Sequence, residues 1–265
     1  MTDAGFFGPS SVAWRLHSDP VMLAGGMRAL LVQALNPRAM AAIDQFGKFR
    51  EDPWGRLERT SNFVLATTFG DTATAEAAAA RVRAVHSRIF GVDPHTGTPY
   101  SATDPDLLLW IHAVEVESFV VAYRAYAGHL SRADADRYVA EMARVAEMVE
   151  LPPAMAPRSM GQLHDYLKSV TGLAVTPAAR DGLRTVLAPP MPVLLRPAWV
   201  IPATAAIAIL PGFARRMYRI PWFPPATIPV RAGVFGLSRV LIRVRPRHPM
   251  VQAARQRVQP HPSAA

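Results

Sequence analysis

The stretches DPWGRLERTSNFVLATTFG (residues 52–70) and DTATAEAAAARVRAVHSRIFG (residues 71–91) follow one another directly in the chain. Each begins with an aspartate and ends with a glycine, the residues that commonly cap the two ends of an α-helix. Between these ends, apolar residues recur every three or four positions, as they do on one face of a helix. The two stretches therefore predict consecutive helices, the second reaching Gly91, and they favour an all-α fold.

Similar helix signals continue along the chain, in which proline or a short polar residue marks most helix starts. Residues 93–100 are rich in turn formers and predict a loop or short hairpin. Prolines become dense beyond residue 188. We therefore expect one bundle-like helical domain over residues 1–250 with a proline-rich C-terminal extension, and a disordered basic tail over residues 251–265. The other predicted helices cover residues 21–35, 38–46, 106–130, 131–149, 159–169, 177–187, 207–218 and 231–244.

The composition excludes several classes of chemistry. The chain has 265 residues and no cysteine, which excludes disulfides, thiolate nucleophiles and cysteine-bound metals. The net charge of +9 comes almost entirely from arginine. No aromatic-interleaved or helix-turn-helix pattern accompanies this charge, so we expect no nucleic-acid partner. A peripheral contact between the basic C-terminal third and an anionic membrane surface stays open.

The ends and the apolar runs of the chain bear on its location. The N-terminus lacks the basic and apolar regions of a signal peptide. The longest apolar run, residues 198–210, contains Pro202 and is shorter than the roughly 20 residues of a membrane span, so we expect a buried helix there. We expect a cytoplasmic protein that either stays in solution or associates with a membrane surface.

Two groups of polar side chains in the opening stretches are candidates for chemistry. Arg56, Arg59 and Thr60 share one helical face, which we expect to look inward, and His86 lies in an otherwise apolar stripe. His112 is a second mid-helix histidine, whereas histidines near the chain ends, such as His17, are expected to be solvated. Burial of such groups costs free energy unless they have partners.

The chemistry of these groups fits more than one role. The common nucleotide-binding, hydrolase and metalloprotease motifs are absent. A histidine on an apolar helix face is most often packed in the core. It is also what an axial haem ligand requires, and arginine and threonine supply donors for haem propionates or for iron-bound oxygen.

Several ordered blocks of the chain resemble one known family. They are Trp14-Arg15 and residues 25–37 (GGMRALLVQALNP), 49–60 (FREDPWGRLERT), 85–91 (VHSRIFG), 100–105 (YSATDP) and 108–113 (LLWIHA). Together they resemble the bacterial latex-clearing rubber oxygenases and the fungal oxygenase of mycophenolic acid biosynthesis.

This resemblance implies a globin-like packing of helices around one haem b, and dioxygen as co-substrate. It implies oxidation of a hydrophobic, isoprenoid- or lipid-like small molecule, with His86 as the proximal iron ligand. Arg56, Arg59 and Thr60 match the distal positions, where Arg59 replaces a lysine of the rubber enzyme. The acid that serves there as a base falls near residues 40–45, where Asp44 is the nearest candidate.

Two other functions stay open at this stage. One is a non-catalytic haem- or lipid-binding protein of the same fold. The other is a structural or interaction protein with packed histidines, which would be colourless when purified.

Overall fold

The chain folds almost entirely into α-helices, as the sequence predicts. The computed structural model describes residues 3–244 and 248–258. Within these residues, the α-helices are α1 (Val12–His17), α2 (Met22–Gln33), α3 (Pro37–Phe46), α4 (Pro53–Phe69), α5 (Thr72–His86), α6 (Pro105–Tyr126), α7 (Arg132–Met148), α8 (Met160–Ser169), α9 (Pro177–Leu187), α10 (Arg196–Ala208), α11 (Gly212–Tyr218), α12 (Thr227–Val244) and α13 (Pro249–Val258). Two short 3-10 helices, η1 (Val193–Leu195) and η2 (Pro224–Ala226), and one hairpin, β1 (Phe90–Val92) with β2 (Pro99–Ser101), complete the described fold.

Polar caps explain why most predicted helix starts are accurate. Asp52 accepts a hydrogen bond from a backbone N–H at the start of α4, and Asp71 does the same at the start of α5. Ser131 and Thr176 cap α7 and α9 in the same way. Each cap satisfies one of the N–H groups that the first turn leaves without a partner.

Four details differ from the prediction. The helix α5 ends at His86, because Phe90 pairs with Ser101 in an antiparallel hairpin instead of continuing the helix. The apolar run 198–210, which we expected to be a buried helix, lies almost entirely in α10, but the single helix predicted over residues 207–218 is divided between the end of α10 at Ala208 and α11. The helix α1 was not predicted. Residues 251–258, expected in a disordered tail, belong to α13, whose Val251 is buried; the rest of that expected tail, residues 259–265, lies outside the described residues.

The helix α6 forms the centre of the fold and packs closely along α2. A Cβ atom at Gly25 of α2 would lie 2.9 Å from the ring of Phe119 on α6, so glycine permits this close approach. The indole N–H of Trp110 donates to the carbonyl of Gln33 at 3.0 Å. The Tyr126 hydroxyl donates to the carbonyl of Ala205 at 2.7 Å and ties α6 to α10.

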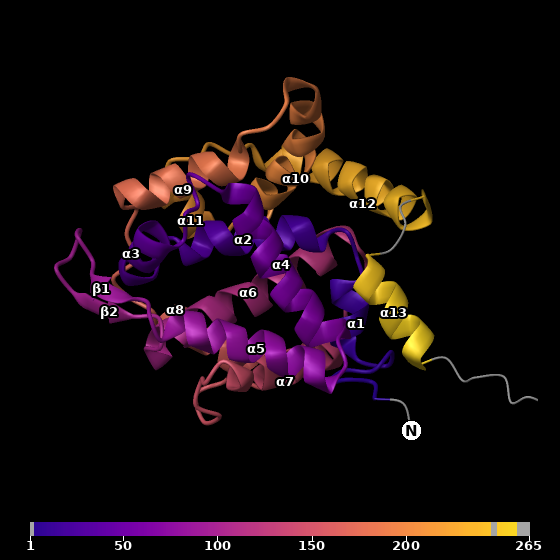
Figure 1. Ribbon diagram of the computed structural model, residues 1–265. Helices are drawn as coiled ribbons and strands as arrows, with labels where there is room; N and C mark the ends of the chain where they lie inside the picture. Colours follow the sequence, from indigo (N-terminus) through magenta and orange to yellow (C-terminus); the bar gives the residue numbers. More distant parts are fainter. Residues whose placement is uncertain (1–2, 245–247, 259–265) are drawn as a thin grey trace, which may run out of the picture.

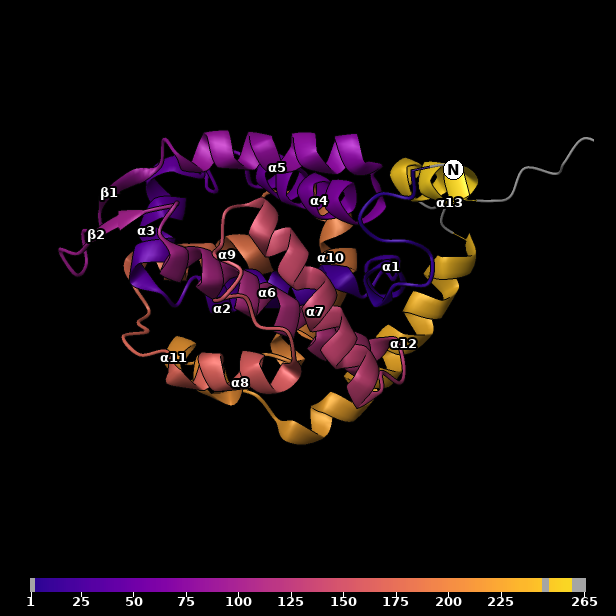
Figure 2. The same ribbon diagram turned by 90° about the horizontal axis from the view of Figure 1, so that it is seen from below.

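Other helices surround this centre on two sides. In Figure 1, α9, α10, α11 and α12 lie above α2, while α5, α7 and α8 lie below it. Seen from below, α7 crosses in front of α6 and α5 runs beside α4 at one edge (Figure 2). The helix α13 packs against α4, so the end of the described chain contacts the helix that carries the first candidate residues.

The described residues contain no single helix that is long and apolar enough to span a membrane. Residues 193–208 and 212–218 meet that criterion only as a pair, and the pair is bent by 116°.

Candidate functional site

An apolar pocket of about 360 Å³ lies against the inner face of α4. Its walls come from α1, α2, α3, α4, α6, α9 and α10, so residues far apart in the sequence meet there. The volume falls in the range of pockets for small organic ligands, about 300–1,000 Å³. The polar or ionisable side chains in the lining are His17, Asp19, Gln33, Arg56, Thr60, Ser61, Glu115 and Thr185.

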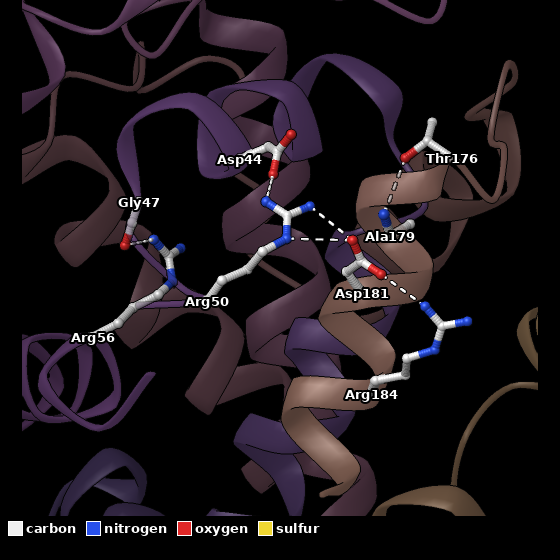
Figure 3. Close-up of polar contacts among 8 residues, drawn as sticks. All are labelled: Asp44, Gly47, Arg50, Arg56, Thr176, Ala179, Asp181 and Arg184. Carbon is white, nitrogen blue, oxygen red and sulfur yellow. Dashed lines mark hydrogen bonds and ion pairs between the residues drawn. The ribbon is translucent and has the colours of Figure 1, made fainter. Parts of the chain in front are cut away.

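Two of the predicted site residues, Arg56 and Thr60, line this pocket from α4. Burial lowers the pKa of Arg56, and the nearby charge of Arg59 acts in the same direction. The Arg56 guanidinium makes a long hydrogen bond of 3.5 Å to the carbonyl of Gly47, shown in Figure 3. The Thr60 hydroxyl donates to the Arg56 carbonyl at 3.1 Å. Arg56 is half-buried as expected, whereas Thr60 is exposed, so its hydroxyl group lies where the pocket wall meets the surface.

Arg59 lies outside the pocket, contrary to the expectation that it looks inward. Its side chain is 62% exposed and forms an ion pair of 3.1 Å with Asp52, the residue that caps α4. Because α4 lies at the edge of the fold, only part of its circumference faces the pocket. Arg59 falls just beyond that part.

His86 is the last residue of α5 and is half-buried. Burial lowers the pKa of its imidazole, which favours the neutral form that binds iron. Its ring makes no hydrogen bond to any of the residues that the structure describes. His86 is not part of the pocket lining, but α5 packs directly against α4.

Glu115 supplies a carboxyl group from α6 to the pocket. Its neighbours in the helix, Val114 and Val116, are buried. Within the described chain, the Glu115 carboxyl group makes neither a hydrogen bond nor an ion pair. Burial raises its pKa to about 7, so the group can hold or release a proton near neutral pH. The available sequence signal was an acidic residue within a nearly continuous apolar helix.

His17 also lines the pocket and is buried, which corrects the expectation that it is solvated. One ring nitrogen lies 2.7 Å from the hydroxyl of Thr68, and the other lies 2.8 Å from the hydroxyl of Tyr138. Burial lowers the pKa of His17 to about 3, so the ring is neutral. The short α1, capped by Ser11, holds it in place. That cap was the available signal, since no longer periodicity marks this helix.

His112 lies one helical turn before Glu115 on α6. Its Nε2 atom is buried and has no hydrogen-bond partner in the part of the chain that the structure describes, and burial lowers the pKa of His112 to about 4. A buried ring nitrogen without a partner costs free energy, so His112 is a second neutral imidazole that a ligand could satisfy.

Asp44 contacts a different group of side chains. It forms an ion pair with Arg50, which also pairs with Asp181 of α9 at 3.0 Å, as Figure 3 shows. Asp181 in turn binds Arg184 at 2.8 Å. Asp44 is absent from the pocket lining. The expected acid of the α3 region therefore joins α3 to α9. The acids in the pocket lining are Asp19, which pairs with Arg239, and Glu115, which has no such partner among the described residues.

These observations define a class of protein: an all-α domain that encloses an apolar pocket and places a cation, a hydroxyl and an uncompensated carboxyl in its wall. Residues 14–255 match the family described as "ER-bound oxygenase mpaB/B'/Rubber oxygenase, catalytic domain". The chain belongs to this family, as the sequence blocks predicted, and it is an enzyme of the oxygenase type. Comparisons with curated proteins and with solved structures give no match.

Proposed function

We propose that this chain is a haem b-dependent oxygenase that acts on a hydrophobic small molecule, with His86 as the axial iron ligand. The observation that carries the proposal is the half-buried, neutral imidazole of His86 on the helix next to the pocket wall. The family supports an oxygenase, the absence of cysteine excludes a thiolate ligand, and a neutral imidazole is a common axial donor to haem iron. Haem, when bound, would activate dioxygen for attack on the substrate.

The pocket is the proposed substrate site. Its lining is mainly leucine, methionine, valine and aromatic side chains, which would bind an isoprenoid- or lipid-like molecule by removing its apolar surface from water. Thr60 and Arg56 would orient the substrate through the few polar contacts that its surface offers. Arg59 has no part in this proposal, because it pairs with Asp52 outside the pocket.

Glu115 would move a proton at its carboxyl oxygen. A carboxyl group with a pKa near 7 can release a proton and take one up within the same reaction cycle. Because no described side chain neutralises the charge of Glu115, its protonation state would respond to the charge that develops on the substrate.

The iron assignment is tested by spectroscopy of the full chain expressed with a supply of haem. We expect one haem per chain and a Soret band that shifts or disappears in His86→Ala. His112→Ala is the matched control, because it removes a second buried neutral imidazole. An unchanged spectrum in His86→Ala refutes the assignment. Loss of the band only in His112→Ala would identify His112 on α6 as the iron ligand instead. A protein that lacks haem under all conditions refutes the cofactor itself.

The alternative is a haem- or lipid-binding relative without catalysis. The uncompensated Glu115 favours the enzyme, since a binding protein gains nothing from a carboxyl that costs free energy to ionise. Oxygen consumption with unsaturated isoprenoid substrates separates the two. A Glu115→Gln variant that keeps the haem spectrum but loses turnover supports the enzyme.

A further inference from the structure

The segment between α9 and α10 carries an exposed apolar tip. Val193, Leu194 and Leu195 are 69, 91 and 56% exposed, and Val200 and Ile201 follow at 60 and 41%. We call these five residues the apolar tip. The segment rises above the neighbouring helices at the top of Figure 1. Exposure of consecutive leucines to water is unfavourable in free energy, so we expect this surface to bind a partner.

The apolar tip is continuous with the rim of the pocket. Trp54 and Trp199 both line the pocket, and their rings meet almost edge to face at 5.2 Å. The indole N–H of Trp54 donates to the carbonyl of Pro190 at 2.7 Å, just before the tip. Trp54 is partly exposed, so the pocket reaches the surface here. Whatever covers the tip therefore also lies against the pocket entrance.

The positive charge of this part of the chain indicates which class of partner the apolar tip binds. Residues 182–265 contain twelve arginines and no aspartate, glutamate or lysine. Arg196 directly follows Leu195 of the apolar tip. A second copy of the chain would bring the same positive charge to the contact and be repelled. Nucleic acid would match the charge, but an aliphatic tip offers no ring on which a base can stack.

We propose that the apolar tip inserts into an anionic lipid bilayer, with the exposed Arg196 facing its headgroups and the pocket entrance held at the membrane surface. Leucine and valine favour the acyl region, while arginine favours anionic headgroups. Insertion is shallow, because Ala205 and Ala206 of α10 are buried inside the fold and only its first turns are free. Tryptophans at the entrance would lie at the depth where they are most common in membrane proteins.

The consequence for the enzyme rests on the proposed function. A hydrophobic substrate dissolved in the bilayer would enter the pocket beside the Trp54–Trp199 pair without crossing water. Docking itself requires neither haem nor turnover.

Docking is tested by co-sedimentation of the full chain with vesicles of phosphatidylcholine alone and with phosphatidylglycerol added. We expect binding to the anionic vesicles that weakens as salt is raised. Leu194→Glu should lower the partition coefficient at least about tenfold, since burial of one leucine is worth more than a decade of affinity. Val92→Glu is the matched control: it adds the same charge at an exposed valine, 54% exposed, on the hairpin. It should change binding less than about threefold.

Several results would overturn the proposal. They are absence of vesicle binding, equal binding to both types of vesicle, or equal loss in the two variants. A dimer in light scattering that becomes a monomer in Leu194→Glu would assign the tip to a second copy instead. Because both substituted residues are exposed, unfolding is not expected, and circular dichroism checks it.

The position of the entrance is tested separately with vesicles of brominated lipid, whose acyl chains quench nearby tryptophans. We expect quenching of the wild-type chain and a smaller quenched fraction in Trp199→Phe. Docking without any such decrease would place the entrance away from the lipid. A chain that binds vesicles but never binds haem would refute the proposed function and leave docking intact.

Discussion

Replacement of Glu115 by glutamine should remove a pH-dependent cost of folding. An exposed glutamate has a pKa of 4.5, whereas burial raises that of Glu115 to about 7 in the folded chain. Between these two values the folded chain holds a proton that the unfolded chain has released. Stability contributed by the protonated carboxyl is therefore complete below about pH 4.5 and is lost as the pH rises through about 7.

The size of the effect follows from the difference between the two pKa values. At about 1.4 kcal/mol per pH unit, ionised Glu115 costs about 3 kcal/mol above pH 7, and less if the pocket admits water. Glutamine has nearly the same shape and cannot ionise. Glu115→Gln should therefore gain about 2–3 kcal/mol relative to wild type at pH 8 and less than about 1 kcal/mol at pH 5.

The difference in unfolding free energy between Glu115→Gln and wild type is measured by urea unfolding at pH 5, 6, 7 and 8, followed by tryptophan fluorescence. The haem content of the two proteins is kept equal. Glu58→Gln on the exposed face of α4 is the matched control and should show no such trend. A glutamine effect that stays constant from pH 5 to 8 would refute the reasoning, because it would mean that Glu115 is not held protonated by its surroundings.

Two further predictions concern buried groups. His17 should destabilise the fold in acid, because its pKa is lowered to about 3 in the folded chain and is 6.5 when the residue is exposed. The free energy of unfolding should therefore fall by up to about 1.4 kcal/mol for each pH unit below 6.5. His17→Gln should reduce this acid dependence in urea unfolding. A variant that keeps the full acid slope would assign the loss to other groups. Arg28 is 3% exposed and pairs with Glu117, so Glu117→Gln should cost about 3–5 kcal/mol in thermal or urea unfolding, because a buried cation loses its counter-charge. A cost below about 1 kcal/mol would show that Ser118 and the carbonyl of Ile209, its other partners, suffice.

The parts of the fold that sequence reasoning predicted well are those set by neighbouring residues. Asp52 and Pro53 define the start of α4 through a cap and a missing N–H, and both effects act within one helical turn. The end of α5 depends instead on Phe90 pairing with Ser101, a contact across a hairpin that helical periodicity does not contain. The extent of α10, which ends at Ala208 instead of continuing to Tyr218, likewise depends on packing against α2.

The same distinction applies to the site. The shared face of Arg56 and Thr60 follows from helical spacing, and both residues line the pocket. Arg59 is only one residue from Thr60, yet it lies outside, because the position of α4 at the edge of the fold is a tertiary property. Asp44 pairs with Arg50 and joins α9, whose place beside α3 no local pattern reveals. The iron ligand, the cofactor and the proton-transfer role stay predictions.

The two ends of the described chain are held by the same corner of the fold, and this has a consequence for its biosynthesis. The indole N–H of Trp14 donates to the carbonyl of Thr68, while Arg257 donates to the carbonyl of Phe69 next to it. Asp19 pairs with Arg239, far along the chain. Residues near the N-terminus therefore leave the ribosome long before their partners exist, so nascent chains should remain sensitive to protease until α13 has emerged. During the first part of that interval the pocket wall contributed by Trp199 is still missing, and the proposed haem would have an open path into the half-made protein.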